Sequence, residues 1–246
     1  MTRKVGIAAF LLVLGATAVP IAAAGGGDAS RAAQTAGKKP LKYEDHDLFI
    51  ETNATDRDAG LQLNLDGEDW RRTKIIDPKG RKLVDVRATG PLRPLGLTEL
   101  FFEASEPSFS EVPFRKFKKR FPKGRYTFRG RTVEGRKIVS SDKLTHVVPD
   151  QPRITSPADG ATVDPDGFVV TWDPVTTPPR ATIKTYHVTV VQKRRDLDME
   201  LKGSETSATI PGEFLEPDTK TELEVLSRDK SGNQTITAFK LRTGAE

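Results

Sequence analysis

The chain of 246 residues contains no cysteine, which excludes a disulfide framework, a thiol nucleophile and thiolate metal ligands. Its only histidines, His46, His146 and His187, are scattered and lack the spacing of a zinc-binding helix. There is also no G-x-S-x-G nucleophile elbow and no long strand–helix alternation of the kind that builds a deep substrate crevice. These absences predict a protein that is not an enzyme.

Long apolar runs are equally scarce, and the single one lies at the N-terminus. Arg3 and Lys4 precede the uncharged run 5–19, and residues 21–24 are mostly small, as signal peptidase requires. We predict a cleaved signal peptide over residues 1–24. A retained membrane anchor is the alternative, but the strongly apolar part is shorter than the roughly 20 residues that span a bilayer. No cysteine follows for lipid attachment, and no other transmembrane segment is expected.

Export without disulfides is typical of a bacterial secreted or cell-envelope protein, whose domains are stabilised by apolar burial alone. Residues 25–40 are rich in Gly and Ala and predict a flexible linker. The rest is long enough for two domains, predicted at 41–150 and 151–246. The first carries 22 Lys and Arg against 18 Asp and Glu, and the second 12 against 15. Neither balance is extreme enough to predict a specific nucleic-acid partner.

The first domain shows the period-two alternation of β-strands. Strand-like segments are expected at 48–53, 60–66, 70–77, 82–88, 98–104, 125–130 and 136–148. Turn sequences separate them, the clearest being Asp77-Pro-Lys-Gly80, where Pro78 presets φ. Seven short strands predict an all-β sandwich, which we cannot assign to a family.

One segment of the first domain follows a helical period instead. Phe114, Phe117 and Phe121 share one helical face, with Ser110 as the expected N-cap and Pro113 in the first turn. We predict a short helix that covers an open end of the sandwich.

The second domain carries a recognisable strand skeleton. Phe168-Val-Val-Thr-Trp172, the alternating set Tyr186, Val188 and Val190, the turn Leu215-x-Pro217-x-Thr219 and the loop Asp229–Asn233 follow in order. Residues 152–242 thereby resemble a fibronectin type III module. The resemblance implies an immunoglobulin-like β-sandwich with Trp172 in its core, acting as a spacer or docking unit. It departs from the family at Thr221, where a corner tyrosine is usual, so this corner must be stabilised differently.

Acidic residues near the start of the first domain suggest a calcium loop. Asp56 and Asp58 are two apart and are followed by Gly60, and Asp66 and Glu68 lie one strand further on. Alternate carboxylates converge on hard cations, so these four are the candidate ligands of a calcium ion, and no other cofactor is predicted. The same residues also suit an ordinary hairpin turn, which is the more common use of such a sequence.

Basic residues gather on the predicted helix, opposite its Phe face. They are Arg115, Lys116, Lys118, Lys119 and Arg120. They form either a solvated outer surface or an anion-binding patch for acidic cell-envelope polymers or lipid head groups.

The sequence therefore predicts two tandem β-sandwich domains in an exported, non-catalytic binding or structural protein. Its partner would be an unidentified protein or a cell-envelope polymer. Two alternatives stay open: a small carboxylate-based hydrolase, or an accessory domain of one, using Glu103 and Glu106 or the acids at 56–69, and a calcium-stabilised binding module.

Overall fold

The computed structural model describes residues 39–245. The predicted signal peptide and nearly all of the predicted linker lie outside the described residues. Among residues 39–245, no helix is long and apolar enough to cross a membrane.

Strands dominate the architecture, with a single α-helix among the described residues. The strands around the first hydrophobic core are β1 (Asp45–Asn53), β2 (Asp58–Ile76), β3 (Lys82–Arg87), β4 (Leu97–Glu103), β5 (Gly124–Thr132) and β6 (Lys137–Leu144), with helix α2 at Phe114–Arg120. Those around the second core are β7 (Arg153–Ser156), β8 (Thr162–Val163), β9 (Gly167–Asp173), β10 (Ile183–Gln192), β11 (Arg195–Lys202), β12 (Ser207–Pro211), β13 (Lys220–Asp229) and β14 (Gln234–Thr243). Two 3-10 turns, η1 (Gly90–Leu92) and η2 (Gly212–Phe214), complete the set. We call the two groups the first and second domains.

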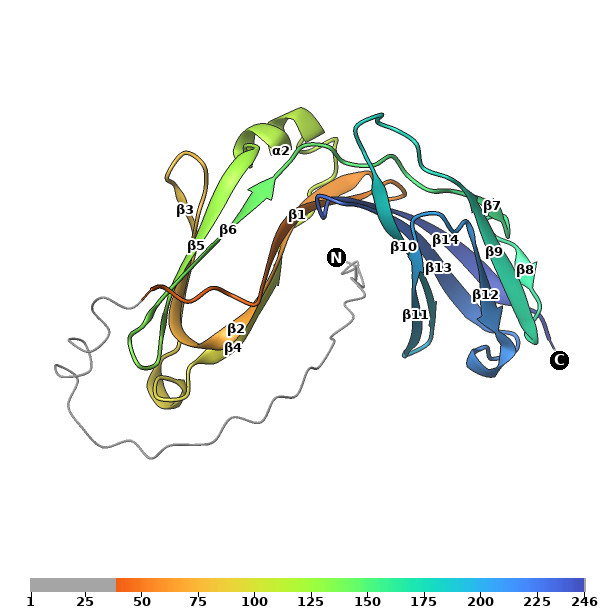
Figure 1. The fold of residues 1–246 in the computed structure, drawn as a ribbon. Helices are drawn as coiled ribbons and strands as arrows, with labels where there is room; N and C mark the ends of the chain where they lie inside the picture. The colour runs from red at the N-terminus through yellow and green to blue at the C-terminus, as the bar shows by residue number, and fades with distance from the viewer. Residues whose placement is uncertain (1–38, 246) are drawn as a thin grey trace.

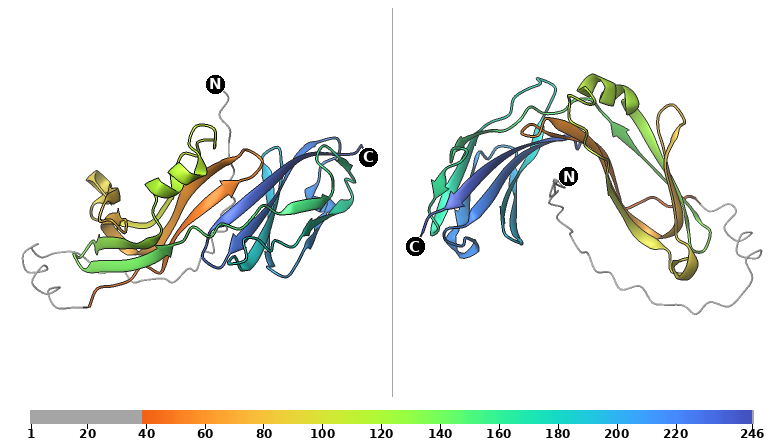
Figure 2. Two further views of the ribbon diagram at one scale, coloured as in Figure 1. Left: turned by 90° about the horizontal axis from the view of Figure 1, so that it is seen from above. Right: turned by 180° about the vertical axis from the view of Figure 1, so that it is seen from behind.

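One sheet of eleven strands runs through both domains, in the order β11-β10-β13-β14-β1-β2-β5-β6, with β3 and β4 on β2 and β8 on β14. A separate sheet, β12-β9-β7, covers one face of it in the second domain. Figure 1 shows the long sheet curving as an arch, with β7, β9 and β12 on the outer side of one limb and α2 on the outer side of the other. In both views of Figure 2, β1 and β14 meet between the two domains.

The long strand β2 gives the first domain its two layers. Its first half pairs with β1 and β4 and its second half with β3 and β5, with register shifts between Asp66 and Arg72. The sequence predicted two strands here, separated by a turn at 66–69, and that prediction is wrong. The chain stays extended and bends through the irregular pairs, as bulged strands do. Gly67 permits the bend, because a Cβ there would lie 3.1 Å from the Tyr43 ring.

The core of the first domain lies between these layers. Leu61, Leu63 and Leu65 are buried as their alternation predicts, together with Trp70, Tyr126 and Phe128. Helix α2 covers this core with Phe117 buried and with Phe114 and Phe121 partly buried, which confirms the predicted short helix. The predicted cap is wrong: Pro113 is the N-cap residue, and the Ser110 hydroxyl instead hydrogen-bonds that of Ser108 at 2.8 Å.

The second domain is a β-sandwich of the kind that the resemblance implies. Trp172 is buried between the sheets, and its ring lies 5.3 Å from that of Tyr186. Val188 and Val190 point into the same core, as their alternation predicts. Together with the two-layered first domain, this confirms the all-β fold of sandwich-like sheets with one short helix.

The corner that lacks a tyrosine is closed by an amide from the neighbouring strand. Gln192, fully buried at the end of β10, accepts a hydrogen bond from Glu216 N–H at 2.8 Å and donates one to the Thr221 hydroxyl at 2.7 Å. Thr221 in turn donates to the Thr219 carbonyl at 3.2 Å. Gln192 therefore replaces the tie that a tyrosine would make.

The two domains share main-chain pairing as well as a connecting segment. Glu51, Thr52 and Asn53 of β1 lie parallel to the start of β14 at Gln234–Ile236. Beside this pair, the fully buried Asn233 accepts a hydrogen bond from Ile50 N–H and donates to the Val147 carbonyl, both at 2.8 Å. One side chain of the second domain thus holds both a strand of the first domain and the connecting segment.

Candidate functional site

The face of the long sheet that looks into the arch is acidic. Strand alternation and register place carboxylates of both domains on this face: Asp45, Asp47, Glu51, Asp58, Asp66, Glu99, Glu103, Asp196, Asp198, Glu200, Glu222 and Glu224. The Lys and Arg residues on the same strands and face are fewer: Lys202, Lys220, Arg228, Lys240 and Arg242. We call this surface the acidic face. Both hydrophobic cores lie on the opposite side of the sheet, so the acidic face is common to the two domains (Figure 1).

Three carboxylates of this face form a tight group near the domain junction. Glu51 lies on β1, Glu103 ends β4, and Glu106 lies in the loop that follows. One oxygen of each lies within 4.8 Å of the others. We call these three residues the carboxylate cluster.

The surroundings of the cluster leave acceptor atoms without partners. Glu106 lies directly over Gly60, where a Cβ would approach its Oε1 to 2.6 Å. Gln62 is fully buried and donates its Nε2 to Glu51 Oε1 at 2.7 Å. Within the part of the chain that the structure describes, Gln62 Oε1 and Glu106 Oε1 are buried without a hydrogen-bond partner. The site is therefore rich in acceptors and short of donors.

Glu51 also links the cluster to the second domain. Its other carboxylate oxygen accepts a hydrogen bond from the Gln234 amide of β14. The Glu51 side chain is 4% exposed, so this bond and the one from Gln62 lie inside the molecule. A change in the charge of the cluster would thus act on both domains.

Burial and mutual repulsion disfavour the ionised forms of these carboxyls. Burial raises the pKa of Glu51 to about 7. The hydrogen bond from Gln234 lowers this pKa, and the nearby charge of Glu103 raises it. Burial raises the pKa of Glu106 to about 8, and the Glu51 and Glu103 charges add to it. Burial also raises the pKa of Glu103. The cluster as it stands favours uptake of positive charge, as protons or as a cation.

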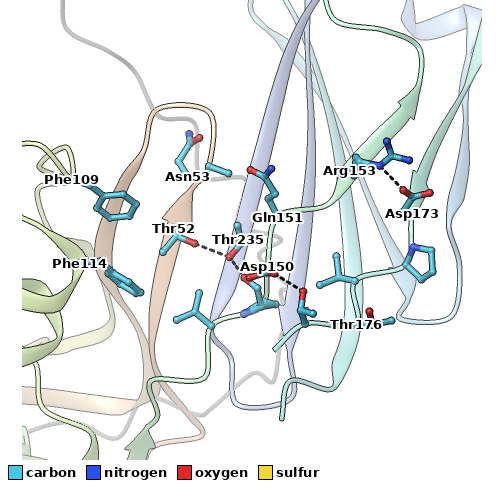
Figure 3. A pocket seen from close by; sticks show the side chains of 16 residues that line it. Thr52, Asn53, Phe109, Phe114, Asp150, Gln151, Arg153, Asp173, Thr176 and Thr235 are labelled. Carbon is cyan, nitrogen blue, oxygen red and sulfur yellow. Dashed lines mark hydrogen bonds and ion pairs between the residues drawn. The ribbon is translucent and has the colours of Figure 1, made fainter. Parts of the chain in front are cut away.

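A crevice at the domain junction lies on the other side of the sheet. Figure 3 shows Thr52, Phe109 and Phe114 of the first domain facing Asp150 and Arg153 across a space of about 570 Å³. Its polar groups already pair with one another. Arg153 bonds Asp173 at 2.5 Å, Asp150 accepts from the Thr177 hydroxyl, and Thr52 bonds Thr235 at 2.7 Å. Of these three bonds, the one between Thr52 of β1 and Thr235 of β14 joins the two domains.

Comparisons with known proteins find similarity of fold only. No protein-family model matches the chain, and no match was found among curated proteins. Among solved structures, the chain is similar to the fn3 domain of human collagen alpha-1(XX) chain, with 19% identity over 40% of this chain and 85% of that one and a TM-score of 0.30. It is similar to a two-domain segment of chicken tenascin, with 14% identity over 82% and 99% and a TM-score of 0.29. It is also similar to the FN1-FN3 domains of chicken CNTN1, with 13% identity over 83% and 68% and a TM-score of 0.35.

These neighbours are fibronectin type III structures. That is the family which residues 152–242 resemble in sequence. The fold assignment depends on the strand order and the two buried cores.

The four predicted calcium ligands are not brought to one point. Asp56 lies in the β1–β2 turn, where the Asn53 side chain accepts its N–H at 3.1 Å. Asp58 begins β2, and Asp66 lies eight positions along the same extended strand, about 26 Å away at 3.3 Å per residue. Glu68 is further still. The four residues are therefore not brought together, and calcium binding near Asp56 and Asp58, or near Asp66 and Glu68, stays a prediction.

The predicted basic patch lies on the outer side of the arch. Arg115, Lys116, Lys119 and Arg120 are exposed on α2, and Lys118 is partly buried with its ammonium 4.6 Å from the centre of the Phe114 ring. Its use as an anion-binding surface stays a prediction.

Sequence reasoning noted Glu103 and Glu106 but missed Glu51 and Gln62. Both are polar positions in alternating strands, where side chains ordinarily face solvent. Only the register of β1, β2 and β4 brings them together, and no local pattern encodes that register.

Proposed function

We propose that the protein is an exported, non-catalytic binding protein of the bacterial cell envelope or extracellular space. The observation that carries the proposal is the continuous sheet, which joins both domains and gives them one shared acidic face. A surface held in fixed shape by main-chain pairing suits recognition, because little ordering is needed on binding. The second domain then extends this surface and serves as its docking unit.

The chemistry of the acidic face identifies the kind of partner. Carboxylates of β11 and β13 continue the row that begins with Glu51 and Glu103 in the first domain. Such a surface attracts a basic partner and repels anionic polymers. We infer that the partner on this face is a protein with a basic segment. Acidic cell-envelope polymers would approach the basic outer surface of α2 instead.

Site-directed photocrosslinking in the producing cell tests this proposal. A photoreactive residue at Lys240, an exposed position of the acidic face, should give a discrete crosslinked protein, and one at the exposed Val139 should not. Glu222→Lys with Glu200→Lys should reduce the Lys240-position crosslink at least about ten-fold, because reversed charges repel a basic partner. Crosslinks that are absent at position 240, or equally strong at Val139, would refute the proposed surface.

Export has its own measurement. The mass of the intact mature protein, recovered from the medium or envelope fraction, should correspond to a chain that begins near residue 25. A full-length mass in the membrane fraction would instead indicate that residues 1–24 are retained as a membrane anchor.

A carboxylate-based hydrolase is the second candidate, because the structure brings Glu103 and Glu106 together. Retaining glycosidases place two carboxyl groups about 5–5.5 Å apart, and burial raises the pKa of one of them, as at Glu106. Polysaccharide or ester turnover that is abolished in Glu106→Gln would establish this activity. Turnover that Glu106→Gln leaves unchanged would come from elsewhere.

A further inference from the structure

We propose that Glu51, Glu103 and Glu106 bind a calcium ion at the junction of the two domains, with the side-chain carbonyl of Gln62 as a further ligand. The site differs from the one that the sequence suggested at Asp56, Asp58, Asp66 and Glu68. It also requires no partner protein. The calcium experiment can therefore fail while the proposed binding function holds, and the reverse is also true.

The donor atoms select the class of cation. All of them are carboxylate or amide oxygens, which are ligands for hard cations such as Ca²⁺ and Mg²⁺. Zinc and copper sites generally include imidazole or thiolate ligands, and the chain has no cysteine.

The spacing favours calcium over magnesium. Oxygens that lie about 2.3–2.6 Å from a central ion can be as much as about 5 Å apart, whereas the Mg²⁺ distance of about 2.0–2.1 Å limits them to about 4.2 Å. The cluster oxygens lie within 4.8 Å of one another, a separation that two oxygens on one calcium ion can span. Glu103 is exposed, which leaves room for the water ligands that complete a calcium sphere.

The unpartnered acceptors supply an independent reason for a bound cation. Gln62 is 0% exposed, and its Nε2 is held by Glu51, so its Oε1, on the same amide carbon, also lies at the cluster. Across the β2–β4 pair, Gln62 lies directly opposite Glu103, another member of the cluster. A buried carbonyl oxygen without a donor is destabilising, because it has lost its hydrogen bonds to water. Among the described residues, Gln62 Oε1 and Glu106 Oε1 both lack a donor at this place, and a cation would satisfy both.

The charges around the cluster point the same way. Asp58 on β2 and Glu224 on β13 add to the negative potential that the three glutamates create. A divalent ion would relieve this repulsion between like charges.

Calcium titration of the full chain tests the proposal. Protein stripped with chelator and then dialysed should bind one equivalent of calcium by isothermal titration calorimetry. Its melting midpoint should rise by at least about 5 °C when calcium exceeds the dissociation constant 100-fold. Glu103→Gln and Glu106→Gln should each weaken binding at least about ten-fold. Glu103 is exposed, so its variant keeps the test valid even if Glu106→Gln folds poorly.

Two matched variants locate the site. Glu99→Gln removes a carboxylate from the same face of β4, about 13 Å from Glu103, and Glu68→Gln removes an exposed one at the bend of β2. Both should bind calcium as the unaltered protein does. The proposal is overturned if calcium gives no heat and no shift, or if binding survives in both cluster variants. It is also overturned if Glu68→Gln abolishes binding, or if magnesium stabilises as strongly as calcium.

Discussion

At the scale of single residues, Gln192 shows how this chain replaces a missing side chain. Its amide satisfies one donor and one hydroxyl at a corner between strands, both inside the fold. We predict that Gln192→Ala lowers the free energy of unfolding by about 2–4 kcal/mol, because two buried polar groups lose a partner. Urea denaturation measures the loss. Gln151→Ala, at an exposed glutamine, should change stability by less than about 0.5 kcal/mol. Equal losses in the two variants would contradict this account of the corner.

Glu224 gives the acidic face a pH dependence that can be isolated. Burial raises its pKa to about 7, and the charges of Glu222, Glu51, Asp198 and Asp56 add to the shift. The unfolded chain ionises near pH 4.5, so the folded state binds more protons between about pH 4.5 and 7, and stability falls as the pH rises through this window.

We therefore predict that Glu224→Gln, compared in chelator with the unaltered protein, loses less stability between pH 5 and pH 8. The difference should be about 1–3 kcal/mol. Glu213→Gln, at an exposed position of η2, should keep the full pH dependence. Melting curves at pH 5 and pH 8 measure this loss of stability. The same loss in all three proteins would refute the assignment to Glu224.

Residue patterns predicted what depends on neighbours in sequence and missed what depends on register. The buried alternating residues follow from the strand period alone; they are Leu61, Leu63 and Leu65 in the first domain and Tyr186, Val188 and Val190 in the second. The contact of Gln192 with Glu216, and that of Glu51 with Glu103 and Glu106, could not be predicted, because each joins segments that are distant in the chain.

At the scale of elements, α2 is short and its stability comes from packing. Seven residues without a side-chain N-cap do not form a stable helix alone, and Phe117 is the residue that anchors it to the first core. We predict that Phe117→Ala lowers the unfolding free energy by about 3–5 kcal/mol, whereas Lys119→Ala on the exposed face changes it little. Chemical denaturation compares them, and a small effect of Phe117→Ala would show that the core does not need the helix.

The strand β2 shows the limit of turn signals. Asp66-Gly-Glu-Asp has turn chemistry, yet pairing to β1 and β4 before it and to β3 and β5 after it keeps the segment extended. Tertiary pairing overrides the local preference here. At Asp77–Gly80 no such competition exists, and the predicted turn forms, with Gly80 N–H donating to the Asp77 carbonyl at 3.0 Å and Gly80 at φ +80°.

At the scale of the whole molecule, the pairing of β1 with β14 removes a free strand edge from each domain. Unpaired edges template association between chains. We predict that a fragment of residues 151–246 self-associates, because the start of β14 would have no neighbour, while the full chain stays free of this association. Size-exclusion chromatography with light scattering measures it.

A charge on that edge provides the control for the fragment. Ile236→Lys should return the fragment to a monomer, since lysine blocks edge pairing. A fragment that is monomeric without this change would show that the edge of β14 is protected in some other way.

The same pairing has a consequence for the order in which the molecule is made. β1 leaves the ribosome, or an export channel, long before its partner, since Glu51 and Gln234 are separated by 183 positions. During that interval the first domain can assemble its core but keeps one open edge, which exposes it to proteases and to neighbouring nascent chains. A chain interrupted before β14 would keep this vulnerability permanently. The final strand thus makes protection of the first domain conditional on synthesis of the second.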